Sequence, residues 1–199
     1  MPRRSQEDRS RTTRTSLEQA GRRLFAEQGY TGTSAEQLVT AAGVTRGALQ
    51  HHYGDKRGLF LAVLERLESE ITTEIEHALQ APVTDDILTA MASGLNAFLE
   101  ICQRPEMIRI ALFDAPAVLG WQAWRELEAR HGLGLVTTEL QRARDTGLIT
   151  ATAVPVLAQL ILSAVSEAGL IVAHADDKDT ARAQAQQSLL LLVGGLLRS

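Results

Sequence analysis

The sequence predicts an all-α fold made of a small amino-terminal helical domain and a larger carboxy-terminal one. Apolar residues recur at three- and four-residue steps along most of the 199 residues, and only five prolines interrupt them. Charge is distributed unevenly along the chain. Residues 1–60 carry ten arginines and lysines against six acids and are therefore basic, whereas the whole chain has a net charge of -4. We therefore divide the chain into domains of residues 1–60 and 61–199, and expect the basic one to bind a polyanion.

Several classes of protein are excluded by what the sequence lacks. Its one cysteine, Cys102, rules out an intrachain disulfide framework and a cysteine-based zinc site or redox pair. The amino terminus, MPRRSQEDRSRTTRTS, has no apolar core of a secretory signal, so we expect a cytoplasmic protein. There is no Ser/His/Asp order, no glycine-rich phosphate loop and no metal-ligand spacing among the histidines, so we predict no enzyme, no cofactor and no metal.

The first helix is predicted from Thr15 to Gln28. Leu17, Ala20, Leu24 and Phe25 form its apolar stripe, and Gly29 supplies a stop. Four of the arginines that precede the predicted helix belong either to a solvated tail or to an arm that enters a minor groove: Arg3, Arg4, Arg9 and Arg11.

Two short helices follow. Thr33 and Glu36 have capping-box spacing for the first of them, which ends at Gly43 because glycine adopts the left-handed conformation of a helix end. Thr45 is a suitable cap for the next helix, Arg46 to Tyr53, with Leu49 as its buried anchor.

This pair forms a helix-turn-helix, whose second helix fits the major groove of DNA. Arg46 offers paired donors to guanine, and Gln50 offers a donor and an acceptor to adenine. The predicted base-reading residues are Arg46, Gly47, Gln50 and His51. The predicted phosphate-binding residues are Thr33, Thr45, His52, Tyr53 and Lys56; packing within the domain is the alternative for His52 and Tyr53.

Residues 21–60, GRRLFAEQGYTGTSAEQLVTAAGVTRGALQHHYGDKRGLF, resemble the DNA-binding domain of TetR-family transcriptional regulators. LFAEQGY, AAGVT, GALQHHY and DK occur in order at the family's usual spacing. The resemblance implies a homodimeric, all-helical repressor whose carboxy-terminal domain binds a small molecule. Gln50 stands where family members commonly have a tyrosine that touches the DNA, so their base preference is not carried over.

Further helices are predicted at 56–80, 85–102, 105–113 and 120–145, separated by proline- and glycine-containing stretches. The helix at 56–80 begins at the recognition module and continues into the larger domain. The resemblance implies that ligand binding in the larger domain moves this helix and changes the separation of the two recognition helices in a dimer.

Candidate pocket residues are few because aromatic residues make up only 4% of the chain. They either line an apolar effector cavity or belong to the ordinary core: Phe98, Phe113, Trp121 and Trp124. Glu167 lies in the apolar run VPVLAQLILSAVSEAGLIVAH and needs a partner. It holds ligand, pairs with an arginine, or lies in a subunit interface.

That run is long enough to span a bilayer, but its polar residues and Pro155, which suits a first helical turn, favour a helix of a soluble protein. The last segment, ARAQAQQSLLLLVGGLLRS, is also helical and apolar. These two terminal helices either pack within the chain or form a four-helix interface with a second copy. We predict a homodimer that represses transcription from a palindromic operator and responds to a small-molecule effector. The alternative is an architectural or adaptor protein that binds DNA without such a ligand.

Overall fold

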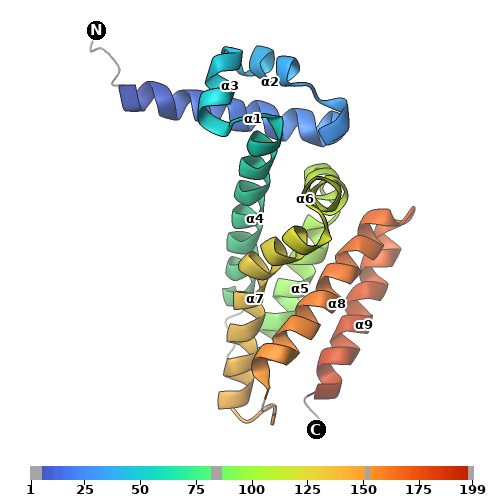
Figure 1. Ribbon diagram of the computed structural model, residues 1–199. Coiled ribbons are helices and arrows are strands. Elements are labelled where there is room, and N and C mark those ends of the chain that lie inside the picture. Colours follow the sequence, from blue (N-terminus) through green and yellow to red (C-terminus); the bar gives the residue numbers. More distant parts are fainter. Residues whose placement is uncertain (1–5, 82–86, 151–152, 197–199) are drawn as a thin grey trace. The chain divides into compact units, whose positions relative to one another are not determined.

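The computed structural model describes residues 6–81, 87–150 and 153–196 (Figure 1). Within them there is no strand, which confirms the all-α class. The elements are α1 (Gln6–Gly32), α2 (Ala35–Ala42), α3 (Arg46–Tyr53), α4 (Lys56–Gln80), α5 (Ile87–Ile101), the π-helix η1 (Met107–Asp114), α6 (Ala115–Leu119), α7 (Trp121–Asp145), α8 (Val154–His174) and α9 (Lys178–Leu196). Arg3 and Arg4 lie outside the described residues.

The chain forms two compact units. The first unit is Met1–Leu67 together with Pro105–Gly120, and the second is Glu68–Arg104 together with Trp121–Ser199. The helix predicted at 56–80 is confirmed as α4, whose residues are shared between the two units.

Helix α1 is longer than the sequence predicts. It begins at Gln6 rather than Thr15, and Gly29 interrupts it with a φ of 73° and a ψ of 170° before it ends at Gly32. Its predicted apolar stripe is confirmed, because Leu17, Ala20, Leu24 and Phe25 are all buried. The stripe therefore forms the core of the first unit together with the buried side chains of α4.

The cap of α2 differs by one residue from the prediction. Ser34, not Thr33, is the N-cap, and it forms the capping box with Gln37 instead of Glu36. Thr33 is 1% exposed, and its hydroxyl donates to the carbonyl oxygens of Leu24 and Gly29 at 3.2 and 2.8 Å. The buried Thr33 therefore anchors the connection between α1 and α2.

Helix α3 has the predicted bounds. Thr45 is its N-cap and accepts the backbone N–H of Ala48 at 3.3 Å, while Leu49 is buried at 3% exposure. Gly43 has a φ of 65° and ends α2, as expected for a residue that tolerates the left-handed region. The glycine bend and the buried leucine together fix the helix-turn-helix.

Segment η1–α6 belongs to the first unit although it is distant in sequence. Arg22 donates through Nε and Nη2 to Glu106 at 2.8 and 2.7 Å, and Asp114 accepts the backbone N–H of Tyr30 at 2.6 Å. Arg109 lies 3.5 Å from Asp114 and packs against Gly29, where a Cβ would clash with its guanidinium. Polar contacts therefore tie this segment to the interrupted end of α1.

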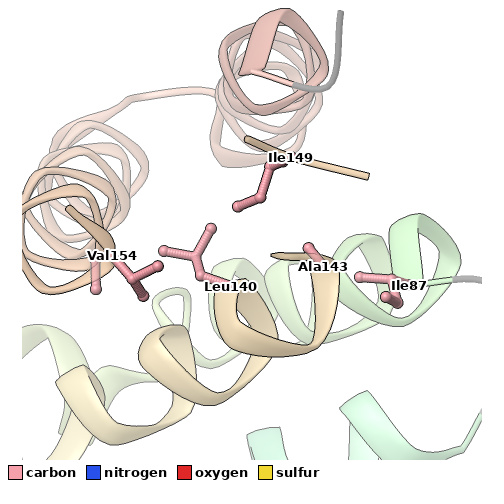
Figure 2. Close-up of a cluster of buried hydrophobic side chains, with 6 residues drawn as sticks. Ile87, Leu140, Ala143, Ile149 and Val154 are labelled. Atoms are coloured by element: carbon pink, nitrogen blue, oxygen red, sulfur yellow. The ribbon is translucent and has the colours of Figure 1, made fainter. Parts of the chain in front are cut away.

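The second unit is a helical bundle with buried leucine, isoleucine, valine and alanine side chains. One cluster joins α5, α7, α8 and the connection between the last two: Ile87, Leu140, Ala143, Ile149, Val154 and Ala158 (Figure 2). Helix α8 is long and apolar enough to cross a membrane by length and composition, but it packs against α7 and α9 and its proline lies in the first turn, as predicted. We therefore interpret α8 as a core helix of this unit.

Candidate nucleic-acid interface

The predicted base-reading residues share the exposed face of α3. Arg46, Gly47, Gln50 and His51 are all exposed, and they lie at positions that a helix brings to one side. Arg46 has no ion pair within the part of the chain that the structure describes, so its guanidinium is not neutralised by a neighbouring carboxylate. This face therefore presents a planar cation and a side-chain amide in neighbouring turns, with Gly47 beside them.

The hydroxyl groups predicted to bind phosphate lie in different surroundings. Thr45 is exposed at the start of α3, with its oxygen accepting the Ala48 N–H. Thr33 is buried, so a phosphate contact from its hydroxyl requires two internal hydrogen bonds to break. The geometry is thus more favourable for Thr45 than for Thr33.

Tyr53 ties the end of α3 to α1. Its hydroxyl donates to Oε1 of Glu18 at 2.8 Å and lies 3.4 Å from the carbonyl oxygen of Arg14. Burial, followed by the hydrogen bond to Glu18, raises the pKa of Tyr53 to about 12. Since the phenol has one proton to donate, a phosphate contact stays a prediction that requires the bond to Glu18 to open.

The rings of the two adjacent histidines pack edge to face. The ring centroids of His51 and His52 are 4.9 Å apart at an interplanar angle of 67°. Burial, then the charges of His51 and Arg14, lowers the pKa of His52 below its usual 6.5. A neutral imidazole at neutral pH has one N–H with which to approach a phosphate.

Lys56 begins α4, where the sequence predicts it, but its ammonium points into the first unit. Nζ donates to the carbonyl oxygens of Tyr30 and Thr33, both at 2.9 Å, and lies 4.1 Å from the centroid of the Tyr30 ring. An ammonium has three hydrogens, so one remains for the predicted phosphate contact. No sequence pattern indicates the two carbonyl partners, because they depend on the break in α1.

The predicted pocket residues are dispersed. Phe113 belongs to η1 in the first unit, whereas Phe98, Trp121, Trp124 and Glu167 belong to the second. Trp121 and Trp124 have ring centroids 5.0 Å apart, but Trp121 is 66% exposed and Trp124 only 2%. Phe98 is partly buried and lies close to Cys102 and Gly169. Glu167 is exposed, so burial does not oblige it to find an ionic partner within the chain.

A carboxylate with a desolvated environment and an ionic partner is Glu128, which sequence reasoning missed. Burial raises its pKa, and Arg125 and Ser166 counter this shift; the Arg125–Glu128 ion pair measures 2.7 Å. Arg125 also donates to Ser163 at 2.7 Å, which links α7 to α8. Arginine and glutamate three residues apart are common on exposed helix faces, so the sequence alone gives no signal that this pair is partly buried.

A metal centre is not part of the described structure. Among residues 6–81, 87–150 and 153–196, no group of three or more histidine, cysteine, aspartate and glutamate side chains could hold an ion. Cys102 is fully buried, and burial, then Glu68 and Glu128, raises the pKa of its thiol. A protonated thiol is a poor nucleophile and a poor metal ligand.

Two family models match the chain. The model described as bacterial regulatory proteins, tetR family, matches residues 18–63, which include α2 and α3. The model described as the tetracyclin repressor-like C-terminal domain matches residues 88–196.

Known proteins are similar over different lengths. A TetR-family transcriptional regulator from Pectobacterium atrosepticum is 33% identical, with 98% of this chain and 99% of that chain covered and a TM-score of 0.84. The resorcinol complex of RolR, which is 19% identical, shares the fold with a TM-score of 0.71 over 94% of this chain and 90% of RolR.

Curated relatives match over shorter segments. The HTH-type transcriptional repressor AcnR of Corynebacterium glutamicum is 45% identical over 56 residues, which is 28% of this chain and 30% of AcnR. The HTH-type transcriptional regulator AcrR of Shigella flexneri is 37% identical over 100 residues, 50% of this chain and 46% of AcrR. The chain therefore spans less than half the length of these curated relatives.

Proposed function

Because the chain belongs to the TetR family of transcriptional regulators, we propose that it is a cytoplasmic, homodimeric repressor that a small molecule releases from a palindromic operator. The observation that carries the proposal is the exposed face of α3, held in place by Leu49. Members of this family regulate transcription and are not enzymes. Residues 1–60 then act as the DNA-binding domain, and residues 61–199 bind the effector and form the dimer.

Recognition of the operator rests on α3 in the major groove, which is wide enough to admit a helix. Arg46 pairs with the O6 and N7 acceptors of guanine, and Gln50 pairs with adenine. Gly47 has open space where a Cβ would stand, its nearest neighbour being Oγ1 of Thr45 at 3.8 Å. The lack of a side chain there lets the helix backbone approach the base edges.

Dimerisation rests on α8 and α9. The exposed side of α8 carries Val156, Leu160 and Ile171 at 62, 63 and 53% exposure, and α9 exposes Leu191 and Leu192 at 71 and 63%. On α8 these residues fall on one side of the helix, and Glu167 lies among them. A second copy that covers both faces removes this apolar surface from water and places Glu167 in the interface.

The effector is proposed to bind the second unit. RolR shares the fold and binds resorcinol, which supports a small organic ligand for this architecture. Phe98 and Trp124 are the aromatic residues best placed to line such a site, since Trp124 is buried and the partly buried Phe98 packs against a core cluster of the unit. The effector needs only to favour the DNA-incompetent arrangement by about tenfold per site to shift the balance by about 1.4 kcal/mol.

Selection of duplexes from a random pool tests the proposal, followed by a screen of metabolites for those that dissociate the complex. On the selected operator, Arg46→Ala loses about 1–3 kcal/mol of binding free energy while random DNA is affected far less. Arg23→Ala, an exposed arginine of α1 that pairs with Glu27, is the matched control. A folded protein that enriches no duplex contradicts the proposal, and equal losses on both DNAs reassign Arg46 to a phosphate.

A further inference from the structure

Helix α1 starts well before the part of the chain that the amino-terminal family model matches. The matching family model begins at residue 18, whereas α1 begins at Gln6. We call residues 6–16 the α1 extension. At 1.5 Å per residue it is about 16 Å long, which equals about five base pairs of B-DNA.

The α1 extension has no side chains suited to packing on protein. Its sequence, QEDRSRTTRTS, contains no apolar residue, and Arg9, Arg11 and Arg14 are exposed. A helix that is polar on all sides gains little from burial and needs another reason to be ordered. Five hydroxyl groups and three guanidinium groups within three turns offer a dense set of hydrogen-bond donors.

The recognition helix fixes where the extension lies. The Tyr53 hydroxyl at the end of α3 reaches the carbonyl oxygen of Arg14 and the carboxylate of Glu18. The Arg14 charge also acts on His52, where it contributes to the lowered pKa. Figure 1 shows the first turns of α1 projecting beyond α3, and both helices belong to the first unit. The extension is therefore held beside the proposed DNA-reading face.

One face of α1 carries arginine, hydroxyl and carboxylate side chains. They are those of Glu7, Ser10, Arg11, Arg14, Thr15 and Glu18. Two of the three acids near these arginines have cationic or hydroxyl partners: Asp8 contacts Arg11, and Glu18 contacts both Arg66 and Tyr53. The third, Glu7, is exposed in the first turn of the helix. With Glu18 neutralised by Arg66, Arg14 remains as a cation that adjoins α3.

We propose that the α1 extension is a second DNA-binding element, in which Arg11 and Arg14 contact the phosphates that flank the site read by α3. The inference rests on the proposed DNA-binding function and adds a surface to it. Because an α-helix is about 10–12 Å wide and the minor groove only about 6 Å, helical arginines reach phosphates from outside the groove. Arg9 and Arg11 therefore do not act as the extended minor-groove arm that their sequence position allowed.

The test compares two duplexes and two variants. One duplex holds only the bases protected by the recognition helices, and the other adds about five base pairs at each end, the reach of the extension. The variant is Arg11→Gln with Arg14→Gln. The control, Arg23→Gln, removes an exposed arginine of the same helix that lies nine residues from Arg14, about half a turn around the axis. Circular dichroism and thermal melting confirm that both variants fold.

Wild-type protein and the control bind the long duplex more tightly than the short one. The double variant loses this preference, and the slope of log affinity against log salt on the long duplex becomes shallower by about 3.6, because the dimer no longer neutralises four phosphates and each accounts for about 0.9. Unchanged affinity and slope overturn the inference and leave the extension a solvated helix. Equal weakening on both duplexes also overturns it, because the arginines then bind within the α3 site. Wild-type protein that binds neither duplex contradicts the proposed function itself.

Discussion

Among the individual residues, Tyr53 couples the protonation of the protein to its stability. Its pKa is raised from 10 to about 12 in the folded chain. The folded state thus holds the proton more tightly, so this contribution is complete below pH 10 and is lost as the pH rises towards 12. We expect denaturant unfolding to show a falling free energy across that interval.

The variant Tyr53→Phe isolates this contribution. It retains the ring but has no proton to lose, so its stability falls less steeply above pH 10, with the raised pKa values of Tyr30 and of the Cys102 thiol still acting in the same direction. Identical pH profiles for the variant and the wild type would show that Tyr53 ionises freely in the folded protein.

Lys56 has a structural role that its sequence position does not reveal. Lys56→Ala removes two charge-assisted hydrogen bonds to carbonyl oxygens, so we expect the free energy of unfolding to fall by about 1.5–3 kcal/mol. Lys178→Ala, the only other lysine of the sequence, is the control. If Lys56 also binds phosphate, its variant weakens binding to all DNAs and shows a shallower salt dependence. Unchanged stability with weakened binding would exclude the structural role.

Among the helices, the contact between α1 and η1 compensates for the break at Gly29. Tyr30 directly follows the break, where the regular helical hydrogen bonding is interrupted. Its backbone N–H is accepted by the carboxylate of Asp114. We expect Asp114→Ala to lower the free energy of unfolding by about 1–3 kcal/mol, because a partly buried donor is left unpaired.

Asp114→Asn is the control for this prediction, since its amide oxygen still accepts a hydrogen bond. Urea unfolding of both variants measures the difference. Equal stability of Asp114→Ala and the wild type would mean that water replaces the carboxylate at no cost.

Local sequence signals predicted α3 well and α1 poorly. Thr45 and Leu49 each act within their own neighbourhood, so α3 can be derived from the sequence. The start of α1 has no apolar period to detect. Thr33 and Ser34 both have a residue suited to a capping box three positions later, so the sequence does not distinguish them as the cap of α2. In the structure Thr33 is buried and bonded to Gly29, and Ser34 is the cap. The pairing of Arg22 with Glu106 joins residues 84 apart, and no local pattern indicates it.

In the protein taken as a whole, α8 and α9 govern the proposed assembly. We expect Leu160→Glu to produce monomers in sedimentation experiments, because it places a charge in the middle of the proposed interface. Operator affinity falls with it, since two linked reading heads bind far more tightly than one. Leu148→Glu, at a leucine that is 40% exposed outside α8 and α9, is the control. A dimer that survives Leu160→Glu contradicts this interface.

The sequence predicted that the last two helices are apolar, but not which of their faces are exposed. Phe98, Trp121 and Trp124 are alike in composition, and only the fold distinguishes the buried Trp124 from the exposed Trp121. Glu167 and Glu128 show the same ambiguity: the glutamate within the apolar run is exposed, and the glutamate within a charged stretch is mostly buried. Burial depends on which helices meet, and that information is not local.

The first unit is discontinuous in sequence, since Pro105–Gly120 folds with Met1–Leu67. A chimera that exchanges only the amino-terminal stretch between two such regulators would separate Arg22 and Tyr30 from Glu106 and Asp114. Moving the operator preference to another regulator therefore requires the transfer of both segments. When the genes of such regulators recombine, a compatible pair of these segments must be inherited together.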